Sequence, residues 1–377
     1  MTSIFLTTST KMPFDLCSLS LPIPFRQAFS HASASRRFAE NVIVVARDQE
    51  GRIGLGEGCP RPYVTGETLE AAQAFLAAHL PLLANIQDLD ALRSWSTSNR
   101  VAIDLCPSAF CAAELALLDL IAQRDGVSVE TLLGLPPIID QPLSAVYSAS
   151  SGLAFTAQHL VFRSRGVRDA KLKISGNSAR DKSRARQLAR FGTVRVDANN
   201  LWRDAAQAIK ALTPMAPFIW AVEEPCSPKD WASMTAIQMI TGLTLIADES
   251  VTKVEDLEEI PTGLQVAINL RISKHGGLIR TLDILRAAQD RGFDVIIGAQ
   301  VGETSILARA ALGVAAIVPR LRGFEAGYGT WLLQFDVTEP AIKAQLGVDL
   351  TAELQAAPGF GLSPSHKLKD EMERLPV

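Results

Sequence analysis

Acidic and basic residues recur at regular intervals through the middle of this chain, each at the end of a short apolar run. They are Lys173, Asp197, Glu223, Asp248 and Lys274, with successive spacings of 24, 26, 25 and 26 residues. Acids brought together without a positive partner repel one another and are costly to bury. Oxygen ligands favour a hard cation, so the three acids predict a site for Mg²⁺, with Mn²⁺ as an alternative. Helix caps or loop ion pairs are the competing explanation for each acid alone, and their common register argues against it.

A pair of lysines precedes the three acids. Lys171 and Lys173 are two residues apart, so on an extended segment they point to the same side. Such a pair is either an exposed surface feature or a buried one with a purpose, because a buried ammonium is costly. A second cation one pleat away, together with burial, disfavours the charged form of a lysine and thereby makes it a better base. Lys274 is expected to face Lys173 across the metal site. The chemistry predicted is removal of a proton from the carbon beside a carboxylate, with the metal stabilising the enediolate.

These residues need a scaffold that brings distant strand ends to one place. Eight short apolar runs alternate with amphipathic stretches, at 143–148, 170–175, 193–199, 218–224, 243–249, 266–272, 295–299 and 317–324. Buried parallel strands followed by helices have this pattern. A (β/α)₈ barrel presents its strand ends at the C-terminal face, where such enzymes carry their chemistry. The fold class predicted is therefore α/β, a (β/α)₈ TIM-type barrel.

The segments that flank the barrel have a different sequence pattern. Residues 1–135 open with β-rich segments followed by helical patterning, which predicts an α+β capping domain. Residues 136–340 are expected to form the barrel, and residues 341–377 to return to the capping domain and complete it. The 377 residues suit a barrel of about 250 residues with a smaller partner.

Composition narrows the range of partners. A net charge of −3 and the lack of a basic run argue against nucleic acid and against a membrane surface. The sequence has no apolar stretch near the ~20 residues that span a bilayer, and its first residues do not resemble a signal peptide. The five cysteines lack metal-type spacing and are expected to be reduced thiols. We therefore expect a cytoplasmic protein, whose partner is the small-molecule carboxylate that the site predicts. Because oligomers are common among such barrels, we also expect a homo-oligomer, without a predicted number of subunits.

The segments around the charged residues resemble the muconate lactonizing enzyme (muconate cycloisomerase) subgroup of the enolase superfamily, within its mandelate racemase/muconate lactonizing enzyme group. Lys171-Leu-Lys173 is similar to the KxK motif, whose second lysine is the usual base. Asp197, Glu223 in Glu-Glu-Pro and Asp248 in Ala-Asp-Glu-Ser match the three metal ligands. The resemblance covers nearly the whole chain and implies the barrel, the capping domain and Mg²⁺.

The segment at 268–277 is similar to the one that carries the second acid/base lysine, which implies this role for Lys274. Arg271, in the same segment, replaces a common lysine. The seventh strand ends in Gly298-Ala-Gln300 and offers no histidine base, which argues against the mandelate racemase subgroup.

The resemblance also implies supporting roles. Asn199 and Glu249 match positions that orient a metal ligand and a lysine. Glu303 is expected near the substrate, with a purely structural role as the alternative. Glu325 stands first in an eighth-strand segment that lacks the DxD pair of dipeptide epimerases and is more similar to that of cycloisomerases. Glu224 replaces a usual Gln, which leaves open whether it joins the metal site.

The function implied is that of an isomerase, either a cycloisomerase or a racemase/epimerase, using two lysines. A lyase of the same superfamily, such as an o-succinylbenzoate synthase or an acid-sugar dehydratase, is an alternative, and so is a non-catalytic protein that retains Mg²⁺ binding. The sequence does not separate them, because these proteins share a fold and a set of ligands while specificity is carried by loops.

Overall fold

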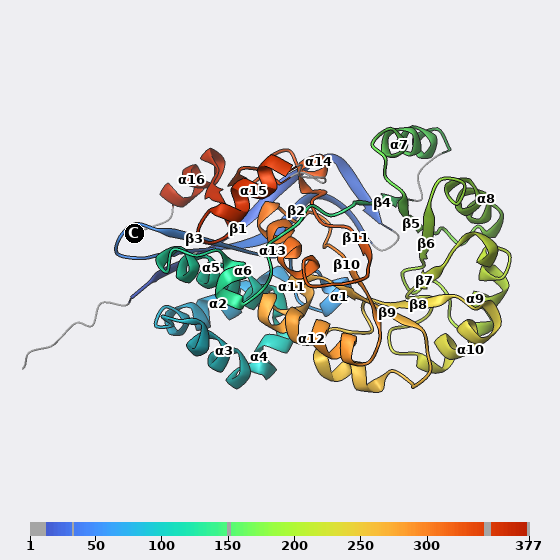
Figure 1. Ribbon diagram of the computed structural model, residues 1–377, viewed down its shortest axis with the longest axis horizontal. Coiled ribbons are helices and arrows are strands. Elements are labelled where there is room, and N and C mark those ends of the chain that lie inside the picture. The colour runs from blue at the N-terminus through green and yellow to red at the C-terminus, as the bar shows by residue number, and fades with distance from the viewer. Residues whose placement is uncertain (1–12, 32–33, 149–151, 343–347, 375–377) are drawn as a thin grey trace, which may run out of the picture.

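The computed structural model describes residues 13–31, 34–148, 152–342 and 348–374, with the backbone alone described at 27–31, 34–36 and 348–350. The larger part of the protein is built around a sheet of eight parallel strands that follow one another in chain order (Figure 1). The strands are β4 (Ser144–Tyr147), β5 (Asp169–Lys173), β6 (Thr193–Asp197), β7 (Ala221–Glu223), β8 (Thr244–Ala247), β9 (Val266–Leu270), β10 (Asp294–Ile297) and β11 (Leu321–Phe324). Each falls within, or within one residue of, a predicted run.

Contacts between β4 and β11 bring the first and last strands of this sheet together. Phe324 N donates to Ser144 Oγ at 2.8 Å, and the Tyr328 hydroxyl donates to the Ser144 carbonyl at 2.5 Å. The Tyr328 oxygen also accepts from Val146 N at 3.1 Å. The sheet is therefore a nearly closed barrel, and the predicted fold class is confirmed.

Helices alternate with the strands around the barrel. They are α7 (Gly152–Ser164), α8 (Ser178–Leu188), α9 (Ala205–Leu212), α10 (Trp231–Thr241), α11 (Ile272–His275), α12 (Leu278–Asp290), α13 (Ser305–Ala315) and α14 (Gly329–Leu332). Short polar side chains begin several of them: Asn177, Asp204 and Asp230 each accept a hydrogen bond from a backbone N–H in the first turn. After β8 the chain forms only a 3₁₀ helix, η2 (Val254–Glu259). A second one, η1 (Ala216–Phe218), ends at the first residue of the strand predicted at 218–224.

The N-terminal region is a three-stranded antiparallel sheet covered by helices. Its strands are β1 (Asp15–His31), β2 (Ala34–Arg47) and β3 (Ile53–Gly58), and its helices are α1 (Pro62–Thr65), α2 (Leu69–Leu83), α3 (Leu89–Ser98), α4 (Arg100–Leu105), α5 (Pro107–Arg124) and α6 (Val129–Leu133). Helix α5 lies directly on β3, because alternate residues of that strand are glycines. A Cβ on Gly56 would lie 1.8 Å from the Ala112 carbonyl oxygen, so only glycine allows this approach.

The C-terminal segment returns to the N-terminal region after the barrel. It contains β12 (Thr338–Glu339), α15 (Val348–Ala356), β13 (Ser363–Pro364) and α16 (His366–Glu373) (Figure 1). Gly359 exchanges backbone hydrogen bonds with Val127 and Val129, at 2.9 and 3.0 Å. Phe360 N donates to the buried carboxylate of Asp119 at 2.8 Å. The segment thus packs against α5 and α6, while the domain limits at 135 and 340 stay a prediction.

Residues near the end of β3 contact the loops that follow β9 and β10. Arg61 is buried and donates to the Val301 carbonyl at 2.8 Å. Cys59 N donates to Ser273 Oγ at 2.8 Å, and Asn41 Nδ2 to the Gly302 carbonyl at 2.7 Å. The N-terminal region therefore covers part of the C-terminal face of the barrel. Among the described residues, no helix combines the length and apolar character needed to cross a membrane.

Candidate active site

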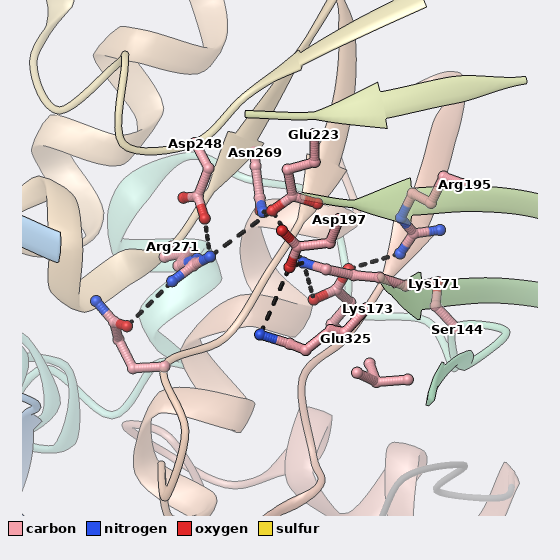
Figure 2. A network of polar contacts seen from close by, with 12 residues as sticks. Ser144, Lys171, Lys173, Arg195, Asp197, Glu223, Asp248, Asn269, Arg271 and Glu325 are labelled. Atoms are coloured by element: carbon pink, nitrogen blue, oxygen red, sulfur yellow. Dashed lines mark hydrogen bonds and ion pairs between the residues drawn. The ribbon is translucent and has the colours of Figure 1, made fainter. Parts of the chain in front are cut away.

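Three carboxylates meet at the C-terminal ends of successive strands. In the strand register Lys173 pairs with Asp197, and Asp197 pairs with Glu223. Asp248 follows the last residue of β8. Figure 2 shows these three acids turned toward one another, with Arg271 approaching from the side of Asp248 and the two lysines from the other side. The sequence spacing thus brings together the residues from which a metal site was predicted.

Each of the three carboxylates has one oxygen that the protein leaves without a hydrogen bond. Asp197 Oδ2, Glu223 Oε2 and Asp248 Oδ2 are all buried. The other oxygen of each acid accepts hydrogen bonds from the protein. Asp197 accepts from Asn199 N at 3.1 Å, and Asp248 accepts from Lys274 at 2.9 Å. Glu223 accepts from Lys171 and from Asn269, both at 2.9 Å. Buried acceptors normally have hydrogen-bond donors, whereas these oxygens meet at most an ion-pair partner, at Asp197 and Asp248. Three converging acids of this kind fit the ligands of a hard cation such as Mg²⁺.

Cations of the protein lie close to these oxygens. Lys171 Nζ is 3.4 Å from Asp197 Oδ2, and Arg271 is ion-paired with Asp248 Oδ2. In this arrangement, no cluster of three or more His, Cys, Asp or Glu within the described ranges is close enough to enclose an ion. Burial alone would raise the pKa of Asp197, but Lys171 and Lys173 outweigh it and hold that pKa below its ordinary value. The acid is therefore ionised and ready to act as a ligand, although its charge is at present balanced by side chains.

Lys171 lies beneath the carboxylates, with its side chain only 3% exposed. Its ammonium is 2.9 Å from Glu223 Oε1 and 3.2 Å from Glu325 Oε2. Burial would lower the pKa of Lys171, but the charges of Glu223, Glu325 and Asp197 outweigh it and raise the pKa above its ordinary value. Lys171 is thus a fixed cation that supports the acids, rather than a proton acceptor.

Lys173 reaches further out, with its side chain 21% exposed. Its ammonium lies 3.3 Å from Asn199 Oδ1 and 3.5 Å from Asp197 Oδ2. Asn199 adopts a left-handed backbone conformation, with φ of 45°. Its backbone N–H binds Asp197 while its side chain binds Lys173, which agrees with the orienting role expected for it.

Lys274 does not face Lys173 as expected. Strand β9 ends at Leu270, and the helical turn α11 carries Lys274 behind Asp248. Its ammonium donates to the Asp248 carbonyl at 2.7 Å, to Asp248 Oδ1 at 2.9 Å and to the Asn269 carbonyl at 2.8 Å. Burial, with the nearby charge of Arg271, lowers the pKa of Lys274 to about 7. A lysine ammonium has three N–H donors, so these contacts use all of them.

Arg271 takes the place expected for Lys274. Asn269 and Arg271 are two residues apart, and Asn269 Nδ2 donates to Glu223 Oε1 at 2.9 Å. The Arg271 guanidinium approaches the same oxygen to 3.8 Å and donates to Gln300 Oε1 at 3.1 Å (Figure 2). Neither Asn269 nor Gln300 had a predicted role, and Arg271 was predicted only as the replacement of a common lysine. The two-residue alternation at the end of the strand is the signal that could have identified Asn269 and Arg271.

Glu303 was expected near the substrate, and Glu325 either near the substrate or behind the residues that contact it. Glu325 is instead held from beneath by Lys171 and by Arg195 Nη2, which is 2.6 Å from it. Burial opposes ionisation of Glu325, but these two cations lower its pKa to about 2. Glu303 is buried behind Gln300, whose backbone N–H donates to it at 2.6 Å, and burial raises its pKa to about 8. Glu325 therefore supports Lys171. The alternation of Arg195 with Asp197 along β6 could have identified Arg195 as the second partner of Glu325.

Glu224 does not point toward the three acids. It accepts from Asp248 N at 2.7 Å, from Ser250 N at 2.8 Å and from Ser250 Oγ at 2.8 Å. It thus fixes the loop that carries Asp248 instead of joining the other carboxylates. Glu249 is partly buried, and burial together with the charges of Glu224 and Asp197 raises its pKa to about 8.

Comparison with known proteins gives consistent similarities. The family profile described as enolase C-terminal domain-like matches residues 154–368. The L-Lys-D/L-Arg epimerase of Methylococcus capsulatus is 29% identical over 90% of this chain and 94% of its own. Its structure with Mg and the dipeptide L-Arg-D-Lys, at 25% identity, superposes with a TM-score of 0.76 over 92% of this chain and 98% of that one.

Two other solved structures show the same fold. Muconate lactonizing enzyme from Pseudomonas fluorescens gives a TM-score of 0.81 at 23% identity, over 95% of this chain and 98% of that one. The N-succinyl Arg/Lys racemase of Bacillus cereus gives a TM-score of 0.80 at 22% identity, over 94% and 96% of the two chains. The similarity in each case extends through the N-terminal region as well as the barrel.

Proposed function

Because the chain belongs to the enolase C-terminal domain-like family of the enolase superfamily, we propose that it is a magnesium-dependent isomerase that removes the α-proton of a carboxylate substrate. One observation carries the proposal. Three buried acids converge on successive strand ends, each with one oxygen that accepts no hydrogen bond and meets at most an ion-pair partner, beside a lysine that reaches solvent. The epimerase and racemase names of similar proteins support the isomerase class.

The proposed ligands of Mg²⁺ are Asp197, Glu223 and Asp248, with Mn²⁺ as a substitute. Bound Mg²⁺ would neutralise negative charge that develops on the substrate carboxylate. For the ion to be enclosed, the Arg271 guanidinium has to move away from Asp248, since it pairs with the oxygen that would bind the metal. Lys171, from beneath, would hold Glu223 in place throughout.

Lys173 is the proposed base. Its ammonium lies beside the acids and its side chain is partly exposed, so a substrate bound over the acids would lie within its reach. Asn199 would orient it, by accepting a hydrogen bond from Nζ while its own backbone N–H holds Asp197. The neutral amine would take the α-proton, and the electron pair of the broken C–H bond would pass into the enediolate of the substrate.

The test is hydrogen exchange with solvent. A pooled set of muconates, dipeptides, N-acyl amino acids and acid sugars is incubated with the protein and Mg²⁺ in D₂O, and mass spectrometry and NMR detect deuterium at the carbon beside the carboxylate. Exchange in one class supports the proposal and names the substrate class, while a dehydrated product would instead favour the lyase. Magnesium binding without exchange in any class would favour the non-catalytic protein.

A further inference from the structure

We infer that Arg271, and not a lysine, is the group opposite Lys173, so that the α-proton is removed and returned on the Lys173 side alone. This inference rests on the proposed function and concerns its stereochemistry. A site with an acid/base group on each side can invert the α-carbon, because one group removes the proton and the other delivers one. A site with a single such group returns the proton to the side from which it came.

The placement of Arg271 follows from the strand. Side chains two residues apart on a strand point to the same side, and Asn269 already binds Glu223. Arg271 continues that row by one step and reaches both Glu223 and Asp248 (Figure 2). Its side chain is 10% exposed and approaches the acids from the side of Asp248, whereas Lys173 comes from the other side (Figure 2).

Lys274 is not available to take over this role. Its side chain is fully buried, and its three N–H bonds go to two backbone carbonyls and to the carboxylate of Asp248. For the ammonium to reach a substrate, it would have to leave all three acceptors. Two of these belong to Asp248, which it holds in position as a proposed ligand.

A guanidinium does not give up a proton under ordinary conditions, whereas a lysine ammonium can do so when its surroundings favour the neutral form. Arg271 can therefore donate hydrogen bonds or pair with a substrate carboxylate, but it cannot accept the α-proton. Its partner Gln300, which accepts from Nη1 at 3.1 Å, is an amide and cannot act as the base either.

The balance of the step is simple on the Lys173 side. The α C–H bond breaks, its electron pair enters the enediolate, and the proton passes to Lys173 Nζ. In D₂O the resulting ammonium exchanges with solvent and returns a deuteron to the same face. Deuterium is thus incorporated with the original configuration retained. Among isomerisations that pass through an enediolate, the arrangement favours cycloisomerisation, which needs proton transfer on one face only, over epimerisation by two bases.

The experiment uses single stereoisomers of the compound class that exchanges, incubated with the full-length protein and Mg²⁺ in D₂O and analysed by NMR and chiral chromatography. We expect one stereoisomer to gain deuterium with retention, and its mirror configuration at the α-carbon to exchange at least 100-fold more slowly. Deuterium with inversion would overturn the inference while leaving the proposed function intact. Inversion that is lost in Glu249→Gln or Glu303→Gln would assign the second group to that acid. No exchange in any class would refute the proposed function and this inference with it.

Arg271→Lys is the diagnostic variant, because it places a group that can transfer a proton at the same strand position. It is expected to raise exchange of the opposite stereoisomer at least tenfold. Arg322→Lys is the matched control, since Arg322 lies in β11, 3.7 Å from Asp294 in β10, and has no contact with the three acids. The control should keep the one-sided pattern of the wild type. If Arg271→Lys also keeps that pattern, position 271 does not face the α-carbon and the inference fails.

Discussion

Replacing each of the two neighbouring lysines, Lys171 and Lys173, by methionine should have opposite consequences for stability and for chemistry. The two side chains are alike and two residues apart, but one is 3% exposed among three carboxylates and the other is 21% exposed near one. Removing one partner of a buried ionic network costs about 3–5 kcal/mol, whereas a partly exposed pair contributes about 0–1 kcal/mol. Lys171→Met is therefore expected to lower the free energy of unfolding by about 3–5 kcal/mol, and Lys173→Met by no more than about 1 kcal/mol.

The chemical consequence falls on Lys173. General base catalysis contributes a factor of about 10²–10⁴, which corresponds to about 3–5 kcal/mol of activation free energy. Lys173→Met is expected to slow α-hydrogen exchange by at least this factor while the protein stays folded. Urea denaturation followed by circular dichroism, without Mg²⁺, measures the stability of both variants, and deuterium incorporation measures the activity of Lys173→Met.

Three results would contradict this reasoning. Exchange within tenfold of the wild type in Lys173→Met would mean that another group removes the proton. A Lys171→Met variant as stable as the wild type would mean that the buried acids are protonated or hydrated, and that Lys171 does not hold them. A loss of stability in Lys173→Met equal to that in Lys171→Met would show that the difference in burial has no energetic meaning.

Three further changes test the ligands, a buried acid and the packing of the N-terminal region. Asp248→Asn should weaken Mg²⁺ binding at least tenfold in calorimetry, because it removes a charged oxygen ligand; unchanged affinity would mean that the ion binds elsewhere. Burial raises the pKa of Glu114 from 4.5 to about 8. Its contribution to stability is therefore full below pH about 4.5 and is lost as the pH rises through about 8, by at most about 5 kcal/mol. In urea denaturation, the free energy of unfolding of Glu114→Gln should fall less between pH 5 and 8 than that of the wild type. Arg309→Met should cost about 3–5 kcal/mol, because Arg309 Nη1 and Nη2 pair with the buried Glu130 at 2.6 and 2.9 Å, and the double variant with Glu130→Met should recover part of it.

The sequence predicted the barrel well because its signal is periodic. Buried parallel strands read as apolar runs, and a βα unit consumes a nearly constant length of chain, so the spacing of charged strand ends fixes their common height. The three acids and Lys173 lie where this periodicity puts them. The strand predicted to begin at Phe218 begins only at Ala221, because Phe218 ends a 3₁₀ helix that starts at Ala216 and whose Pro217 favours a helical start.

The prediction for Lys274 went wrong where the periodicity ended. A spacing of 26 residues from Asp248 matched the earlier intervals, but β9 ends at Leu270 and the chain enters the short turn α11. A strand places a residue every two positions on the site, whereas a turn rotates its side chains away from that row. Counting residues along the chain cannot detect this change, while following the alternation from Asn269 leads to Arg271. The fixed role of Lys171 was also beyond the sequence, because it depends on Glu325, which is far away in the chain.

The strands that build the site contribute residues in pairs, and the members of each pair divide the work by depth. In Lys171 and Lys173, in Arg195 and Asp197, and in Asn269 and Arg271, the first residue lies lower in the barrel and the second lies at the strand end. Each lower residue binds an acid that another lower residue also binds, and all three are almost fully buried. They therefore set the positions of the groups above them. The upper residues lie where the three acids converge: Asp197 and Arg271 form ion pairs there, and Lys173 has a partly exposed amine. Substitutions in the lower row should therefore appear first as losses of stability, and substitutions in the upper row as changes in metal binding, rate or stereochemistry at nearly constant stability.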